Sequence, residues 1–360
     1  MKDRNKIALV TLCSILCIFL ISVTANANVQ DNNGNVESTI QKYSELDEEA
    51  LEQTLNELGT KELIAEIKAL SLQDVGWGLI PFVSELAERK DEISEREIIS
   101  EIKNISNSLF IQEIMVDLYI WKNPDSVIRG DLKQLLNDTA VSNEVKSRIV
   151  SQSSFNSDDI ELLNSLIENN DDILAFNALK KLSSVNEKEA YLLSKKILEN
   201  YESESNMRIS AAQKSAAKYL RKNADPEARK EFIKQCKQIL ESPKTDEMLK
   251  ESSRFALSDM RTKESITEII NSDFFDQSVK VFCIDQNNKI LKEMLTSSSD
   301  ESDIEIVIKA MEIFPLADLG EELEELQTGI KNPELKARCE KVVESIKLNG
   351  IKACPKWEED

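Results

Sequence analysis

The fold is decided by the stretch DDILAFNALKKL, residues 171–182. Its apolar face recurs at the i, i+3, i+4, i+7 spacing of one side of an α-helix, through Ala175, Ala178, Leu179 and Leu182. Two aspartates open the stretch, and acids are favoured at the positive end of a helix dipole. The stretch therefore predicts an amphipathic helix that packs through a face containing small residues.

The same pattern occurs twice more downstream. Residues 207–220, MRISAAQKSAAKYL, and residues 248–260, MLKESSRFALSDM, each place small and apolar residues on one helical stripe. When the three stretches are aligned on Ala178, Ala216 and Ala256, successive copies lie 38 and 40 residues apart. A recurrence at this period indicates an internal structural repeat.

A second helix is predicted before each copy, over residues 159–169, 187–201 and 226–241. One such pair leaves too much apolar surface uncovered to fold alone, whereas stacked pairs cover one another. Small residues at the contact allow the helix axes to approach closely. The sequence therefore predicts an all-α fold made of stacked helix pairs.

The stretches ILAFNALKKL, RISAAQKSAAKYL and KESSRFALSDM resemble the inner helices of HEAT and armadillo-type repeats. The resemblance is clearest over residues 156–262 and continues to residue 348, whereas residues 47–155 predict helices without a clean period. The usual proline of the first helix and the Asp/Arg pair of the second are not present as a set. The resemblance implies a right-handed α-α superhelix with a less regular N-terminal part, and a non-enzymatic binding scaffold.

The composition favours helix and argues against some partners. Glycine and proline are scarce, at 8 and 7 of 360 residues, and alternating runs of β-branched residues are missing. The formal net charge is −21. Because so acidic a chain repels phosphate backbones and anionic bilayers, we expect no nucleic acid partner, but a protein or an anionic polymer bound at a local basic surface.

The N-terminus has the order of a secretory signal peptide: a basic start, an uncharged apolar stretch over residues 7–23, and a small-x-small site ending at Ala27. We expect cleavage there and a secreted or cell-envelope protein; the alternative is an uncleaved membrane anchor. The expected organisation is a signal peptide (1–27), a flexible linker (28–46), an irregular helical part (47–155), the repeats (156–348) and a tail (349–360).

The residue types present argue against catalysis. The chain has no histidine, which removes Ser-His-Asp and Cys-His catalysis and His-bound zinc. It also lacks a glycine-rich phosphate loop and CxxC spacing. Ser-x-x-Lys pairs occur at Ser215–Lys218 and Ser100–Lys103, without the other motifs of Ser/Lys enzymes. We therefore expect a non-enzymatic protein with no cofactor and no metal. The alternatives left open are a carboxylate- or Ser/Lys-dependent extracellular hydrolase, or a structural envelope component held by an uncleaved anchor.

One face of the repeated helices is predicted to bind a partner. Positions −2, +2 and +5 from the aligned alanine point away from the packed stripe, at ~100° per residue. The basic residues at these positions are Lys180, Lys214, Lys218, Arg221, Arg254 and Arg261. Because inner helices line the concave surface of a solenoid, they predict a basic groove for an acidic peptide or an anionic polymer. The alternative is ordinary surface charge, paired with glutamates of the outer helices.

Four cysteines follow the predicted signal peptide. Cys236, Cys283 and Cys339 lie on apolar stripes and are predicted to be buried. Cys354 lies in the tail beyond Gly350, where a turn would bring it back to Cys339. An oxidising exterior permits a disulfide between these two residues.

Overall fold

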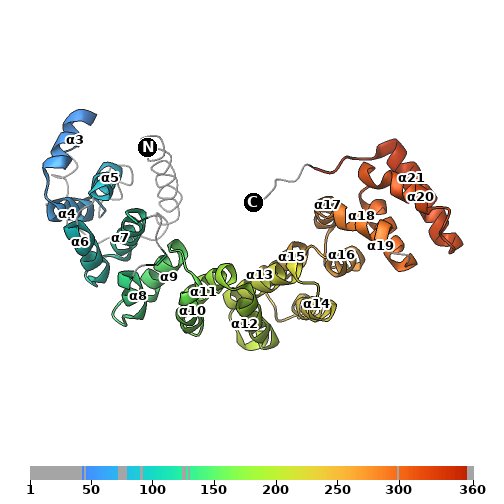
Figure 1. The fold of residues 1–360 in the computed structure, drawn as a ribbon, viewed down its shortest axis with the longest axis horizontal. Helices are drawn as coiled ribbons and strands as arrows, with labels where there is room; N and C mark the ends of the chain where they lie inside the picture. The colour runs from blue at the N-terminus through green and yellow to red at the C-terminus, as the bar shows by residue number, and fades with distance from the viewer. Residues whose placement is uncertain are drawn as a thin grey trace. The chain divides into compact units, whose positions relative to one another are not determined.

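The computed structural model contains helices and connecting segments, with no strand in the residues that it describes (Figure 1). These residues are 43, 46–71, 79–89, 92–123, 127–128, 130–297 and 300–354. The expected all-α class is confirmed for them. The predicted signal peptide and nearly all of the predicted linker lie outside the described residues, as does the end of the tail. Over the described ranges, no helix has both the length and the apolarity to cross a bilayer.

The chain divides into two compact units between Asp159 and Ile160. The helices of the first unit are α3 (Glu48–Glu57), α4 (Thr60–Ser71), α5 (Ile80–Glu88), α6 (Glu92–Lys103), α7 (Leu109–Trp121), α8 (Gly130–Asn137), α9 (Asn143–Gln152) and the 3-10 turn η2 (Ser157–Asp159). Here α5 packs against both α3 and α7, and α7 packs against α9. Next-but-one helices therefore contact each other, as they do in stacked helix pairs.

The first unit fills these contacts with large side chains rather than alanine. Helix α7 buries residues around most of its circumference, including Met115, Leu118 and Tyr119. A helix that is apolar nearly all round has neither a polar stripe nor a small-residue face. For this reason the sequence of residues 47–155 showed helices but no repeat.

The second unit contains the repeated stretches. Its helices are α10 (Ile160–Ile167), α11 (Asp172–Val185), α12 (Glu187–Glu199), α13 (Asn206–Lys222), α14 (Pro226–Glu241), α15 (Glu247–Met260), α16 (Lys263–Asn271), α17 (Gln277–Gln286), α18 (Asn288–Ser297), α19 (Glu301–Ile313), α20 (Gly320–Leu326) and α21 (Pro333–Asn349), with the 3-10 turns η3 (Tyr201–Ser203) and η4 (Ala317–Leu319). The three aligned stretches form α11, α13 and α15, and the helices predicted before them are α10, α12 and α14.

Side-chain caps fix where α11, α13, α15 and α17 begin. In each helix the cap residue accepts a hydrogen bond from the backbone N–H three residues later; the caps are Asp171, Ser205, Asp246 and Asp276. Each cap satisfies one N–H that the first helical turn leaves without a partner. The paired aspartates at 171 and 172 are therefore a helix start, as the sequence predicted.

The predicted register of the repeat is confirmed where α13 packs against α11 and α15. The aligned residues Ala178, Ala216 and Ala256 are 0%, 1% and 2% exposed. Between α13 and α15, Gln213 Nε2 donates to Ser253 Oγ at 2.6 Å. Each of these two polar residues lies three positions before its aligned alanine, so equivalent positions of successive copies face each other.

Hydrogen bonds at both ends show that these helices are parallel. Between α11 and α13, Arg208 donates to Asp172 at 2.9 Å near the helix starts, and Lys218 donates to the carbonyl oxygen of Ser183 at 3.0 Å near the helix ends. Near the helix ends, Arg221 of α13 bonds to Asp259 of α15 at 3.3 Å. The face continues onto α17, where Cys283 Sγ donates to Ser258 Oγ of α15 at 3.2 Å. Side chains at equivalent heights on α11, α13 and α15 therefore lie side by side, and α17 adjoins α15.

The disulfide considered between Cys339 and Cys354 is not formed, and both residues are free thiols. Cys339 is buried on α21, with Sγ 3.6 Å from the carbonyl oxygen of Leu323. Beyond α21 the tail runs along η4 instead of folding back over Cys339, and the backbone N–H of Cys354 donates to Asp285 Oδ1 at 2.9 Å. Burial of Cys236, Cys283 and Cys339 is confirmed.

Candidate functional site

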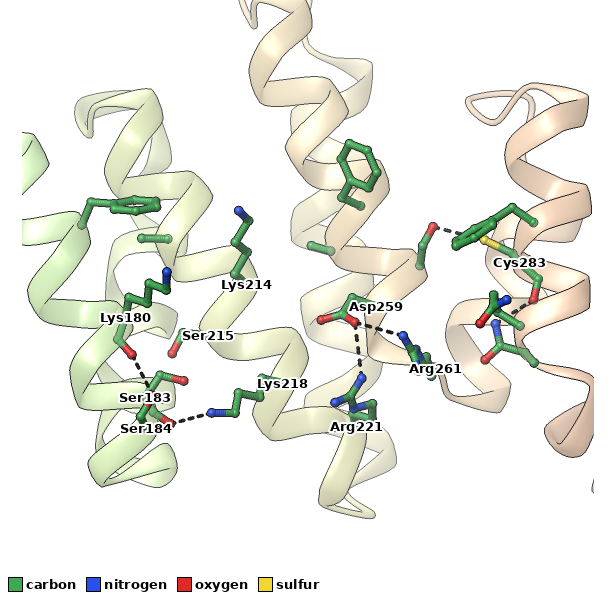
Figure 2. A pocket seen from close by; sticks show the side chains of 18 residues that line it. Lys180, Ser183, Ser184, Lys214, Ser215, Lys218, Arg221, Asp259, Arg261 and Cys283 are labelled. Carbon is green, nitrogen blue, oxygen red and sulfur yellow. Dashed lines mark hydrogen bonds and ion pairs between the residues drawn. The ribbon is translucent and has the colours of Figure 1, made fainter. Parts of the chain in front are cut away.

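A cavity of about 750 Å³ is lined by α11, α13, α15 and α17 of the second unit (Figure 2). These are the next-but-one helices whose equivalent faces lie side by side. The cavity is therefore largely a product of the repeat: α11, α13 and α15 contribute the same face, and α17 adds side chains at one end. Its volume is in the range of ordinary ligand-binding clefts.

Five of the six basic residues predicted to bind a partner line this cavity: Lys180, Lys214, Lys218, Arg221 and Arg261 (Figure 2). The exception is Arg254. Its guanidinium donates to Glu247 and Glu251 at 2.7 Å and to the carbonyl oxygen of Phe274 at 2.9 Å. Acids one and two turns earlier on its own helix thus hold Arg254 away from the cavity.

The alternative that these charges are neutralised by neighbouring acids applies to part of the set. Lys218 Nζ donates to the carbonyl oxygen of Ser183 at 3.0 Å and lies 3.5 Å from Glu187 Oε1. Burial acts to raise the pKa of Glu187, but its pairs with Lys222 and Lys218 hold that pKa below its usual value. Glu187 is therefore charged at neutral pH and offsets part of the charge of Lys218.

Lys180 and Lys214 are different, because both are exposed and neither makes an ion pair with any described residue. Burial and the charge of Lys180 lower the pKa of the adjacent Lys181. Burial of Lys181 is the larger cause, and repulsion by Lys180 adds to it. Two unpaired ammonium groups therefore face the cavity mouth from neighbouring helices.

Asp259 is the single acid among the residues lining the cavity. One of its oxygens lies 3.3 Å from Arg221 Nη1 and 3.9 Å from Arg261 Nη2, so one carboxylate bridges two guanidinium groups (Figure 2). The lining thus carries five cations and one anion. The site is a local positive region on a chain whose net charge is −21.

Arg261 is held in an unusual backbone conformation. It ends α15 with φ 45° and ψ 56°, the left-handed region, and it is the one non-glycine residue with positive φ in the described part of the chain. Glycine is the usual residue at such a helix end because a side chain costs free energy there. Retention of a long cationic side chain at a strained position is typical of functional sites.

Three phenylalanines share the cavity with the basic residues: Phe176, Phe255 and Phe282. Phe255 and Phe282 are 63% and 60% exposed, and Phe176 is half-buried. The sequence analysis missed Phe255 and Phe282, although Phe255 directly precedes the aligned Ala256. The sequence did contain a signal for Phe255. It lies beside the packed stripe, where a large apolar side chain cannot be buried between the two helices of its own pair.

The arrangement gives no support to nucleophilic chemistry. Ser215 is buried, its Oγ has no hydrogen-bond partner, and the ammonium of Lys218 points to Ser183 and Glu187 instead. Burial raises the pKa of the Cys283 thiol although Ser258 opposes the shift. In the first unit Ser100 is exposed and Lys103 lies 3.9 Å from Asp138. Within the described ranges, no three His, Cys, Asp or Glu residues are grouped as metal ligands.

The fold and the cavity define an all-α protein of serially packed helices with a cationic, aromatic-lined cleft on its next-but-one helices. Comparison of the sequence with models of protein families gives no match, and no curated protein is similar to it. The chemistry of the cavity is therefore the basis for a functional conclusion.

Proposed function

We propose that this chain is an exported, non-enzymatic binding protein of the HEAT/armadillo-like class that captures an acidic segment of a protein partner. One observation carries the proposal: five basic side chains from next-but-one helices line one cavity that contains a single acid. The signal-like residues 1–27 support export, and the period of 38 and 40 residues supports membership of a helical-repeat class.

The charge distribution favours an acidic protein segment over a nucleic acid. The net charge of −21 opposes a long, uniformly charged strand, whose phosphates would also face the acidic surface outside the cavity. A short acidic segment meets the local cations only. Lys180 and Lys214 offer charges that no described acid neutralises, so binding there does not first require an ion pair to be broken.

The dimensions favour an extended segment. Packed helices lie 8–10 Å apart, so four side-by-side helices present a row on the order of 27 Å long. An extended chain rises about 3.3 Å per residue, and on the order of eight residues would cover that row. A small molecule of one or two charges would contact only part of the cationic set.

A matched pair of charge reversals tests the proposal. Lys180→Glu with Lys214→Glu changes two exposed cavity lysines, while Lys188→Glu with Lys234→Glu changes two exposed lysines of the outer helices α12 and α14. We expect the first double variant to weaken binding of a fluorescent Glu-rich octapeptide by about tenfold or more, measured by anisotropy. The second should bind as the wild type does.

Equal affinity of the two double variants would refute capture at the cavity. Tight binding of a sulfated polysaccharide, with no binding of the octapeptide, would replace the protein partner by an anionic polymer. Both variants change the net charge equally, so a general electrostatic effect cannot distinguish them. Their thermal melts should match, because none of the four lysines makes an ion pair with a described residue.

A further inference from the structure

The phenylalanines of the cavity come from three of its four helices. Phe176, Phe255 and Phe282 each precede a polar cavity residue by one helical turn: Lys180, Asp259 and Gln286, respectively. In the alignment on the repeated alanines, Lys214 of α13 occupies the position that Phe176 has on α11, so a cation stands in the helix between those that carry Phe176 and Phe255. The cavity therefore places apolar and cationic side chains next to each other.

The exposed phenylalanine surface is unfavourable unless something covers it. Phe255 and Phe282 keep 63% and 60% of their surface in water. Single exposed apolar residues are common on protein surfaces. These two, with the half-buried Phe176 and five cations lining the same cavity, form an apolar patch with a charged rim, which is typical of a recognition surface.

We propose that the cavity selects acidic segments that also carry aromatic or large aliphatic side chains, and that it binds purely polar acidic segments more weakly. This inference rests on the proposed function and specifies the ligand class. Acidic side chains of the segment pair with the cavity cations, and its apolar side chains cover Phe176, Phe255 and Phe282. Charge complementarity then guides association, while buried aromatic contacts supply most of the affinity.

The spread of the cations favours a peptide over an anionic lipid. A fatty acid has one carboxylate, which a single pair such as Arg221 and Arg261 would satisfy. Here unpaired cations also stand on α11 and α13, at Lys180 and Lys214. A segment with several carboxylates uses all of these groups, and its apolar side chains can cover the phenylalanines that lie next to the cations.

Three octapeptides test the inference by calorimetry with the full chain. The first alternates Glu and Leu, the second alternates Glu and Ser, and the third alternates Gln and Leu. We expect the Glu/Leu peptide to bind at least about tenfold tighter than either of the others. The double variant Phe255→Ser with Phe282→Ser should lose this preference. Its affinity for the Glu/Leu peptide should fall to the affinity that the wild type has for the Glu/Ser peptide.

The matched control is Leu192→Ser with Met248→Ser, which removes two exposed apolar side chains outside the cavity, 45% and 75% exposed. This variant should keep the full preference for Glu/Leu. All four positions are exposed, so folding should persist, and the comparison of the three peptides on the wild type does not depend on any variant.

The outcomes separate the two proposals. Equal affinity for Glu/Leu and Glu/Ser, both weakened by Lys180→Glu with Lys214→Glu, would overturn the aromatic selection and leave the proposed function in place. Equal affinity for Glu/Leu and Gln/Leu would overturn the requirement for acids. No binding of either Glu peptide would sink the proposed function itself. Oleate serves as the lipid competitor. If it displaces the Glu/Leu peptide at a concentration below the Kd of that peptide, the site belongs to a lipid anion and both proposals fail.

Discussion

At the scale of single residues, Arg261 shows a conflict between local stability and the site. A non-glycine residue in the left-handed region costs about 1 kcal/mol relative to glycine. Among the described residues, its guanidinium makes one ion pair, a 3.9 Å contact with Asp259, and it lines the cavity. The cost is consistent with a role for the charge in the cavity rather than at the helix end.

We predict that Arg261→Gly raises the free energy of unfolding by about 1 kcal/mol and weakens binding of the Glu/Leu octapeptide. Urea denaturation and calorimetry measure the two effects on the same protein. The control is Arg261→Ala, which also removes the guanidinium but keeps a side chain in the left-handed region. It should lose affinity without gaining stability; a stability gain equal to that of the glycine variant would remove the strain argument.

Residue-level prediction from sequence succeeded where the helical period alone decides direction. Lys180, Lys214 and Lys218 face the cavity because their offsets from the aligned alanines place them opposite the core. It failed for Arg254, whose offset is equivalent but whose guanidinium is held by Glu247 and Glu251. An offset fixes where a side chain leaves the helix, not which neighbour a long side chain reaches.

At the scale of helices, ion pairs link next-but-one elements at separations close to the repeat. Examples are Asp172–Arg208 between α11 and α13, Arg229–Glu264 between α14 and α16, and in the first unit Lys68–Glu101 between α4 and α6. Surface pairs of this kind contribute little stability individually. Their separations of 36, 35 and 33 residues lie close to the period of the alanine pattern.

The alanines set how closely helices approach, and one substitution tests this. Ala216 is 1% exposed on α13, which packs against both α11 and α15. We predict that Ala216→Leu lowers the free energy of unfolding by about 1–3 kcal/mol, because the added carbons must displace neighbouring helices. Urea denaturation measures the loss. Ala224→Leu, in the exposed loop before α14, should be nearly neutral; equal stability of both variants would contradict close packing at Ala216.

At the scale of the whole molecule, the net charge acts against the proposed ligand. A chain of charge −21 repels an acidic peptide over the full Debye length, whereas the cavity cations attract it only at short range. The two effects respond differently to salt. The Debye length is about 30 Å at 0.01 M, about 8 Å at 0.15 M and about 3 Å at 1 M ionic strength. Moderate salt therefore removes the distant repulsion first and the contact attraction later.

Because the repulsion and the attraction respond differently to salt, the affinity should pass through a maximum as the salt concentration rises, instead of declining steadily. Binding of the Glu/Leu octapeptide should strengthen by roughly two- to threefold between 0.01 M and 0.15 M salt, then weaken below its starting value towards 1 M. Anisotropy titrations at fixed pH across this range measure the curve. The Gln/Leu peptide, which carries no charge on its side chains, should show no such maximum. An affinity for Glu/Leu that falls steadily from 0.01 M would mean that the acidic surface does not oppose the ligand, and that the cavity cations alone set its approach.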